Sequence, residues 1–151
     1  MTKNLALFIL ILFSFSYSFA QQDPEMVVAK GAELGENDIP IEAQEFFNEG
    51  IDAMEQENYQ KAISMFTQAL ELAPTFLKSI NNRAYAYLSL GNNQAAIQDF
   101  KKVIEMDSEA HAAFYELGVL ALGDGDQEKA IAKFKKAKSI APDNHQYAYV
   151  L

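Results

Sequence analysis

The chain contains no cysteine, and only two of its 151 residues are histidine. The absence of cysteine excludes a disulfide framework, a thiolate nucleophile and the attachment point of an exported lipoprotein. No second His or Cys lies at ligand spacing from either His111 or His145. Because a zinc site needs several such ligands close together, the sequence predicts no metal centre of that kind.

Motifs of catalysis and cofactor binding are also missing. The chain has no Gly-rich phosphate loop, no Ser-His-Asp set and no recognisable pair of catalytic carboxylates. Asp124, Asp126 and Glu128 form a short acidic run, but the ligand pattern of a calcium loop is absent around them. We therefore expect that the protein is not an enzyme and has no catalytic, cofactor-binding or metal-binding residues.

Basic residues are scarce, since 12 Lys and Arg stand against 21 Asp and Glu and give a net charge of -9. This charge repels nucleic-acid phosphates and anionic membrane surfaces, so no nucleic-acid partner is expected. A local exception is a lysine cluster that is expected to form a solvated helix face, with docking to an acidic partner as the alternative. The cluster consists of Lys133, Lys135, Lys136 and Lys138.

Long apolar runs are confined to the N-terminus, where Lys3 precedes the unbroken run Leu5–Phe13 and small residues follow at Ser18 and Ala20. This order is typical of a secretory signal peptide. The run is too short to span a bilayer core of about 30 Å. We predict a cleaved signal peptide at residues 1–20 and no membrane span after cleavage, with an uncleaved anchor as the alternative. A signal without cysteine favours an exported protein of the bacterial envelope, periplasmic or secreted.

The strongest positive feature of the sequence is a repeat of 34 residues, which occurs three times between residues 43 and 144. Residues 21–38, which precede it, are acidic and poor in aromatic side chains, so a flexible leader is expected there. A shift by one period places small residues over small residues and phenylalanine over phenylalanine. The aligned columns are Gly50, Ala84 and Gly118; Ala62, Ala96 and Ala130; and Phe66, Phe100 and Phe134.

This period and pattern resemble the tetratricopeptide repeat, in which two antiparallel helices form a repeat that stacks on the next pair. The resemblance implies an all-α fold over residues 39–151, an α-solenoid of three stacked antiparallel helix pairs. Each repeat has an A helix, a short turn and a B helix. The small columns would let A and B helices approach closely, and the phenylalanines would fill the space between neighbouring pairs. The repeats are 43–76, 77–110 and 111–144, followed by the short C-terminal segment 145–151.

Turn chemistry supports these boundaries. Between each A and B helix, Gly or Asn is expected to supply the left-handed conformation that ends a helix, and Asn or Asp to cap the next one. Asp38 and Ser108 are expected to cap the first and third A helices. The three turns fall in one register at Glu57-Asn58, Gly91-Asn92 and Gly125-Asp126.

In this family the A helices line a concave face on which a partner peptide or helix lies. The corresponding residues here form an apolar stripe with a few amides, and an exposed stripe of this kind marks an interface. The alternative is that the stripe packs partly against neighbouring helices. The resemblance thus implies a protein-binding groove at Phe47, Asn48, Ile51, Met54, Asn81, Asn82, Tyr85, Leu88, Tyr115, Val119 and Leu122.

The best-known peptide-binding members of the family hold a C-terminal carboxylate in a clamp of Lys and Asn side chains. Only Asn82 fits among the matching residues here, because no cation is present and Glu116 would repel a carboxylate. An apolar groove with amides suits an apolar peptide or an amphipathic helix instead. The matching residues are Phe47, Ile51, Asn82, Ala112 and Glu116.

The array stops soon after its third repeat, although arrays of this type normally finish with a capping helix. Residues 145–151 are too short to cover repeat three alone. Three outcomes are open for them: they enter a partner's groove, stack against a second copy, or fray. Homo-oligomerisation through this end is favoured, since a symmetric contact would bury both ends at once.

We therefore expect an exported adaptor or scaffold whose partner is another protein, held as a peptide or helix in the apolar groove. The alternative is a structural subunit that self-associates or forms part of a larger envelope assembly. The sequence itself does not name the partner.

Overall fold

Residues 38–148 of the chain are described by the computed structural model, within a unit that spans Leu34–Leu151. The predicted signal peptide, residues 1–20, lies outside the described residues. So do residues 149–151 and all of the predicted leader except Asp38. The structure therefore bears on the repeat domain and not on the N-terminal predictions.

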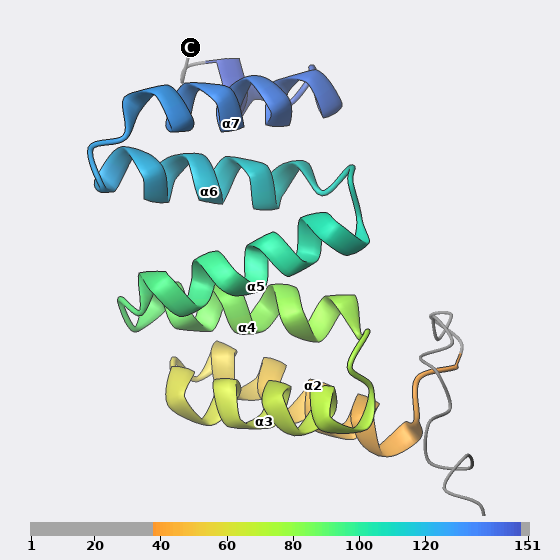
Figure 1. Ribbon diagram of the computed structural model, residues 1–151. Helices are drawn as coiled ribbons and strands as arrows, with labels where there is room; N and C mark the ends of the chain where they lie inside the picture. The colour runs from red at the N-terminus through yellow and green to blue at the C-terminus, as the bar shows by residue number, and fades with distance from the viewer. Residues whose placement is uncertain (1–37, 149–151) are drawn as a thin grey trace, which may run out of the picture. The chain divides into compact units, whose positions relative to one another are not determined.

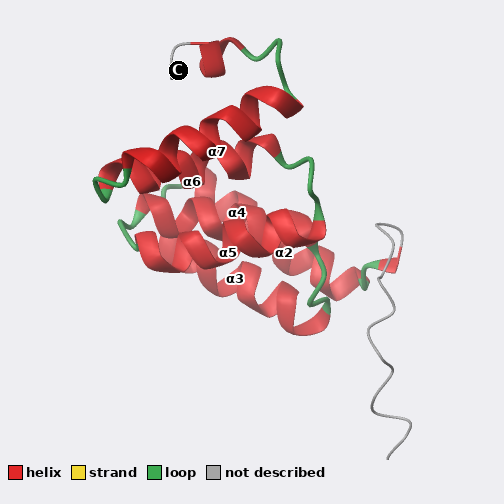
Figure 2. Ribbon diagram, turned by 45° about the horizontal axis from the view of Figure 1, so that its top comes forward, coloured by secondary structure: helices red, strands yellow, loops and turns green. Residues whose placement is uncertain are grey.

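Six α-helices form three antiparallel pairs that follow one another in chain order (Figure 1). Each A helix packs against its own B helix, α3 packs against α4, and α5 packs against α6. Between residues 38 and 148 there is no strand, and short loops join the helices (Figure 2). The all-α solenoid is confirmed. The elements are α2 (Ile41–Glu55), α3 (Tyr59–Leu72), α4 (Leu77–Ser89), α5 (Asn93–Met106), α6 (His111–Gly123), α7 (Gln127–Ile140) and the 3-10 helix η3 (His145–Ala148).

The turns inside the repeats follow the predicted chemistry. The side chains of Asn58, Asn92 and Asp126 each accept a hydrogen bond from the backbone N–H three residues on, at 3.2, 3.3 and 3.0 Å. Gly91 and Gly125 have φ of 72° and 81°, in the left-handed region that glycine adopts without cost. In the first turn the left-handed residue is Glu57, with φ of 58°, rather than Asn58. Asn58 is therefore only the cap.

The predicted caps of the A helices are wrong. The N-cap residues of α2 and α6 are Pro40 and Ala110, and neither helix has a side-chain cap. Between repeats the chain first closes a backbone turn, in which the N–H of Ala110 donates to the carbonyl of Asp107 at 3.2 Å. That turn places the helix start beyond Ser108, and the first helix likewise starts beyond Asp38.

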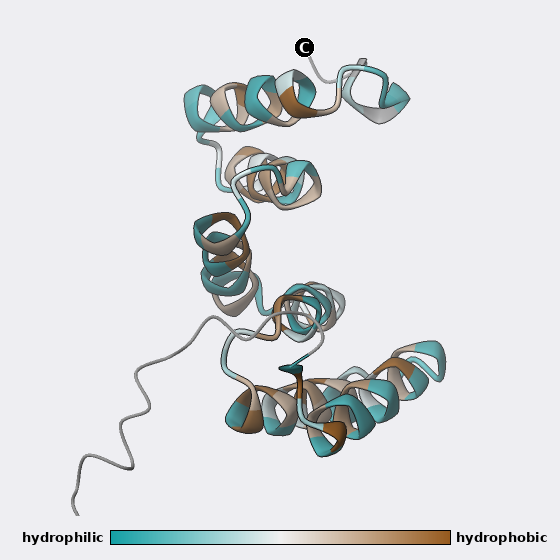
Figure 3. Ribbon diagram, turned by 90° about the vertical axis from the view of Figure 1, so that its right-hand side faces the viewer, coloured by the Kyte–Doolittle hydropathy of each residue, from teal (hydrophilic) through white to brown (hydrophobic). Residues whose placement is uncertain are grey.

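The small columns make the contact between A and B helices, as predicted. The phenylalanines take part in that contact inside repeats one and three, and not only between neighbouring pairs as predicted. A Cβ built on Gly50 would lie 2.6 Å from Cδ1 of Phe66, and one on Gly118 would lie 2.7 Å from Cδ1 of Phe134. Phe66 and Phe100 are fully buried. Each helix carries hydrophobic residues beside hydrophilic ones (Figure 3), as expected for helices that bury one stripe.

Candidate functional site: the A-helix face

The eleven predicted groove residues lie on the three A helices and form what we call the A-helix face. Helix α2 contributes four of them, α4 four and α6 three, and α2 also contacts α4 directly. Val119 and Leu122 are 42% and 51% exposed, and Asn48 is exposed as well. The other eight are half-buried. The residues expected to meet a partner are thus brought onto matching helices, with the most open apolar part on α6.

Part of the apolar stripe packs within the molecule, as the alternative interpretation held. The ring of Phe47 lies 5.0 Å from that of Phe76, and the ring of Tyr85 meets Phe100 edge-on at 5.2 Å. Tyr115 lies 5.5 Å from Phe134, again between ring centroids. These aromatic side chains therefore offer one edge to a partner and use the rest in the core.

Two hollows open along the N-terminal halves of the A helices, and Lys78 lines both. The first, of about 220 Å³, lies between α2 and the start of α4 and is lined by Phe47 and Asn48. The second, of about 310 Å³, lies between α4, the end of α5 and the start of α6. Asn81 and Asn82 line this second hollow. All three predicted amides therefore face space in which a peptide backbone could be hydrogen-bonded.

The positions of the carboxylate clamp have a chemistry unlike the family's. Phe47 and Ile51 pack against core clusters, and the Asn82 side chain donates to the backbone carbonyl of Lys78 at 2.8 Å. Burial raises the pKa of Glu116. Burial also raises the pKa of Tyr85 to about 12, with the charge of Glu116 as the next cause. A carboxyl group thus stands where the clamp would need a cation.

The C-terminal segment folds back onto repeat three. Tyr147 in η3 is only 3% exposed, and its hydroxyl lies 2.7 Å from Nδ1 of His111. Its ring lies 5.2 Å from that of Tyr115, which belongs to the A-helix face. None of the three predicted outcomes included this contact, in which the Tyr147 side chain packs with Phe114 and Ala137 of repeat three. Self-association through this end stays a prediction.

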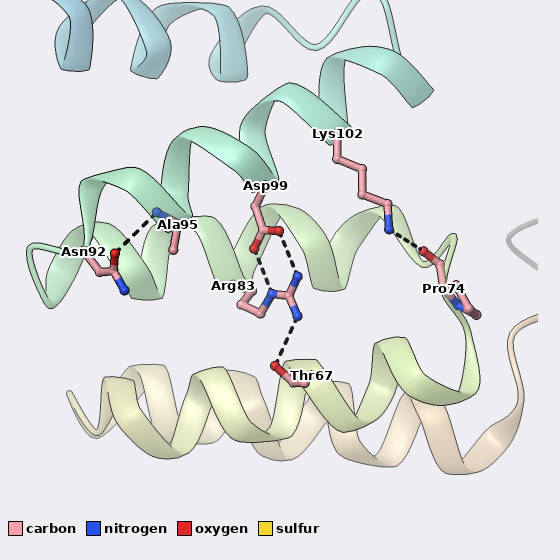
Figure 4. Close-up of polar contacts among 7 residues, drawn as sticks. All are labelled: Thr67, Pro74, Arg83, Asn92, Ala95, Asp99 and Lys102. Carbon is pink, nitrogen blue, oxygen red and sulfur yellow. Dashed lines mark hydrogen bonds and ion pairs between the residues drawn. The ribbon is translucent and has the colours of Figure 1, made fainter.

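A charged network that the sequence reasoning missed joins the first two repeats. The Nε and Nη2 atoms of Arg83 donate to the two carboxylate oxygens of Asp99, each at 2.8 Å, and Nη1 donates to the Thr67 hydroxyl at 3.1 Å (Figure 4). The hydrogen bond to Asp99 raises the pKa of Arg83. The sequence signal was the column of Glu49, Arg83 and Leu117, in which two of the three repeats have a charged side chain.

The described residues offer neither a metal site nor a membrane-spanning helix. Among the described residues, no group of three or more His, Cys, Asp or Glu side chains is placed to hold a metal ion. None of the helices between residues 38 and 148 has the length and apolar character needed to cross a membrane.

Family profiles described as tetratricopeptide repeat match residues 43–76 and 81–145. Small glutamine-rich tetratricopeptide repeat-containing protein 2 of Saccharomyces cerevisiae is 30% identical over 132 residues, which cover 83% of this chain. The chain spans only 38% of that relative's length, so the whole relative's activity is not carried over.

Solved structures show the same architecture. The Sgt2 tetratricopeptide repeat domain from Aspergillus fumigatus is 27% identical, with a TM-score of 0.66 over 74% of this chain and 76% of that one. The first such domain of Spaghetti (RPAP3), bound to the HSP90 peptide SRMEEVD, has a TM-score of 0.68 over 78% of this chain and 90% of that one. It is 19% identical, so it supports the fold alone. Together with the three helix pairs and their shared turn chemistry, these matches show that the chain belongs to the tetratricopeptide repeat family.

Proposed function

We propose that this protein is a protein-interaction adaptor that holds an apolar or amphipathic segment of a partner on its A-helix face. The observation that carries the proposal is the pair of hollows that share Lys78 and are lined by Asn48, Asn81 and Asn82. Amides can hydrogen-bond a peptide backbone of any sequence. The exposed side chains of Val119 and Leu122 on α6 supply apolar area for the partner's side chains.

The chemistry of the face favours an apolar segment over an acidic tail. The first domain of Spaghetti (RPAP3), bound to the HSP90 peptide, shows that a domain of this fold can hold the peptide SRMEEVD. In this chain the clamp positions Phe47, Ile51 and Ala112 carry no charge, and Glu116 is acidic. A carboxylate-rich peptide would meet repulsion from Glu116 and no cation at these positions, although Lys78 lines both hollows.

A peptide panel tests this proposal. Fluorescein-labelled apolar and amphipathic peptides, together with SRMEEVD, would be titrated with the purified protein and binding followed by anisotropy. We expect the apolar set to contain binders and SRMEEVD to bind at least tenfold more weakly than the best of them, since about 1.4 kcal/mol separates them at that ratio. Equal or tighter binding of SRMEEVD would overturn the proposed chemistry.

Surface variants test whether the apolar peptide binds on the A-helix face. We expect the double variant Val119→Ser/Leu122→Ser to bind the best apolar peptide several-fold more weakly with an unchanged circular dichroism spectrum, because both side chains are exposed. Ile131→Ser is the matched control, since Ile131 is 45% exposed on the B helix α7. If the control weakens binding as much as the double variant does, the A-helix face is not the site.

Export to the bacterial envelope, periplasmic or secreted, is a second part of the proposal and depends on residues 1–20. The run Leu5–Phe13 and the small residues Ser18 and Ala20 support it. Mass spectrometry of the protein recovered from an expressing bacterium should find Gln21 at the N-terminus. Recovery of Met1 in the cytoplasmic fraction would contradict export.

A further inference from the structure

The repeat period allows the two junctions between repeats to be compared residue by residue. At the first junction, where α3 and α5 meet α4, the network consists of Thr67, Arg83 and Asp99. A shift of one 34-residue period carries these positions to α5, α6 and α7, which form the second junction. There the residues are Lys101, Leu117 and Lys133.

The charges of the first junction are compensated. Asp99 is only 6% exposed, and both of its carboxylate oxygens accept hydrogen bonds from Arg83. The guanidinium carbon of Arg83 lies 6.0 Å from the centroid of the Tyr87 ring, so an aromatic side chain lies beside the cation. Cation, carboxylate and ring all come from the chain itself.

The second junction is open and basic. A hollow of about 70 Å³ lies there, with the buried side chains of Leu117 and Ala121 and the half-buried Ile97 in its wall. Leucine in the place of Arg83 and alanine in the place of Tyr87 leave this space unfilled. Lys101 and Lys133 also line the hollow. The remaining two lining residues are Asp124 and Lys129.

A carboxylate, that of Asp124, lines the hollow beside these lysines, but within residues 38–148 it forms no ion pair with them. Lys129 forms an ion pair with Asp126 at 3.4 Å. The Nζ atom of Lys133 lies 5.3 Å from the centroid of the Phe114 ring, and within residues 38–148 no carboxylate forms an ion pair with Lys133 or Lys101. Unpaired cations around a partly enclosed apolar wall form an unusual local environment in a chain with a net charge of -9.

We infer that the second junction is a binding site for an acidic, partly apolar segment of a partner protein, one of whose carboxylates enters the hollow. That carboxylate would lie between Lys101 and Lys133 and supply the negative charge that Asp99 supplies at the first junction. An apolar side chain beside it would cover Leu117 and Ala121. A protein segment is favoured over a nucleic acid, because the acidic surface of the whole molecule repels a polyphosphate backbone while a short acidic segment brings few charges.

The site is separate from the A-helix face. On helix α6, Leu117 and Ala121 lie between about a quarter and half a turn away from Tyr115, Val119 and Leu122, given about 3.6 residues per turn. Binding in the hollow therefore neither requires nor excludes a peptide on the A-helix face. Failure of one proposal leaves the other standing.

The test uses an array of eight-residue peptides that combine two Asp or Glu with two apolar residues, each beside a version with Asn and Gln in place of the acids. Binders are titrated by anisotropy with the purified protein. We expect some acidic peptides to bind and their amide versions to bind about tenfold more weakly. If no acidic peptide binds better than its amide version, the inference is wrong.

Lysine variants test whether the acidic peptide binds in the hollow. Lys101→Glu/Lys133→Glu should weaken the best acidic peptide by about tenfold, because each change replaces attraction by repulsion. Lys135→Glu is the matched control, since Lys135 is an exposed lysine of α7 that does not line the hollow. An effect of Lys135→Glu as large as that of the double variant would show a general charge effect and overturn the site.

A third variant is designed to close the hollow with the Thr, Arg and Asp side chains of the first junction. Lys101→Thr/Leu117→Arg/Lys133→Asp installs the residues of the first junction at the second. We expect it to abolish binding of the acidic peptide while keeping the apolar peptide on the A-helix face. An oligonucleotide and phosphatidylglycerol vesicles serve as competitors; displacement of the acidic peptide by either at lower concentration than unlabelled peptide would contradict a protein partner.

Discussion

Arg83 lies in a column where the repeat pattern favours a large apolar side chain, and its neighbours explain why a cation is stable there. Two hydrogen bonds of 2.8 Å to Asp99 and one of 3.1 Å to Thr67 satisfy three of its nitrogens. The pair is mostly shielded from water, with side-chain exposures of 19% and 9%. Breaking such a pair leaves one charge buried without a partner, which costs more than the pair itself contributes.

We therefore expect Asp99→Ala and Arg83→Leu each to lower the free energy of unfolding by about 2 kcal/mol. The double variant should lose less than the sum, with a coupling energy of about 1–2 kcal/mol, because it leaves no orphaned charge. Urea unfolding followed by circular dichroism measures all three. Additive effects of the two changes would mean that the ion pair contributes no coupling.

Gly50 marks a position where even one methyl group has no room. A Cβ there would meet three atoms of the buried Phe66 ring. Overpacking of a core costs about 1–3 kcal/mol, while Ala is favoured over Gly in a helix by about 1 kcal/mol. Gly50→Ala should thus be destabilising by up to about 2 kcal/mol in urea unfolding.

The matched control for this change is Gly123→Ala. Gly123 also lies in a helix, but nothing stands within 4 Å of an added Cβ. This variant should be neutral or slightly stabilising. Equal losses of stability at Gly50 and Gly123 would argue against the close approach of α2 and α3 as the reason for the glycine.

Glu116 makes the stability of repeat three depend on pH. Burial raises its pKa in the folded protein above the value in the unfolded chain. Its favourable contribution is therefore complete below the unfolded pKa and is lost as the pH rises through the folded pKa. Glu116→Gln should raise the melting temperature near neutral pH and leave it unchanged in acid. A variant that melts lower at neutral pH would reverse this sign.

At the scale of elements, the helix pairs and their turns were predictable because their signals are local. Gly91, Gly125 and the three caps each act within a few residues, so the repeat register alone indicates their roles. The caps of α2 and α6 were predicted wrongly; before α6 a backbone turn between repeats replaces the side-chain cap. The Arg83 network was not predicted, since its partners lie 16 residues away on either side.

Helix η3 is short, and the buried side chain of Tyr147 attaches it to repeat three. Tyr147 contributes a buried ring and a hydroxyl contact to His111. Removing the hydroxyl in Tyr147→Phe should cost about 1 kcal/mol, and removing the ring in Tyr147→Ala about 3 kcal/mol. Urea unfolding gives both values.

A structural role for Tyr147 also predicts where the change is felt. Hydrogen exchange should accelerate in α6 and α7 of Tyr147→Ala and stay unchanged in α2 and α3, which lie far along the array. Tyr59→Phe at the first turn is the control for loss of a tyrosine hydroxyl. If Tyr147→Ala unfolds like the unaltered protein, η3 does not cap the third repeat.

At the scale of the whole molecule, the sequence predicted an array and a face but not how much of that face is open. The apolar columns could not distinguish Phe47, which packs on Phe76, from Leu122, which is 51% exposed. That distinction depends on how far neighbouring repeats approach one another. Of the lysines that line the basic hollow, the predicted lysine cluster contained only Lys133, because the wall of the hollow is assembled from three helices.

The unequal junctions have a consequence for how the molecule opens. A repeat array behaves as a linear chain of units whose stability depends on each unit and on the coupling to its neighbours. The Arg83 network strengthens the coupling of repeats one and two, whereas the second junction has a hollow and unpaired lysines instead. Repeat three should therefore open first and most often, as a separate cooperative unit.

Native-state hydrogen exchange measures this directly. We expect amides of α6 and α7 to exchange through an opening of lower free energy than those of α3, α4 and α5. The difference between the two opening free energies should become smaller in Asp99→Ala. A single opening energy for all helices would show that the two junctions are equally strong. If the two opening free energies differ, repeats one and two form a stable unit from which repeat three can detach and rejoin. A partner bound at the second junction would then also hold repeat three in place.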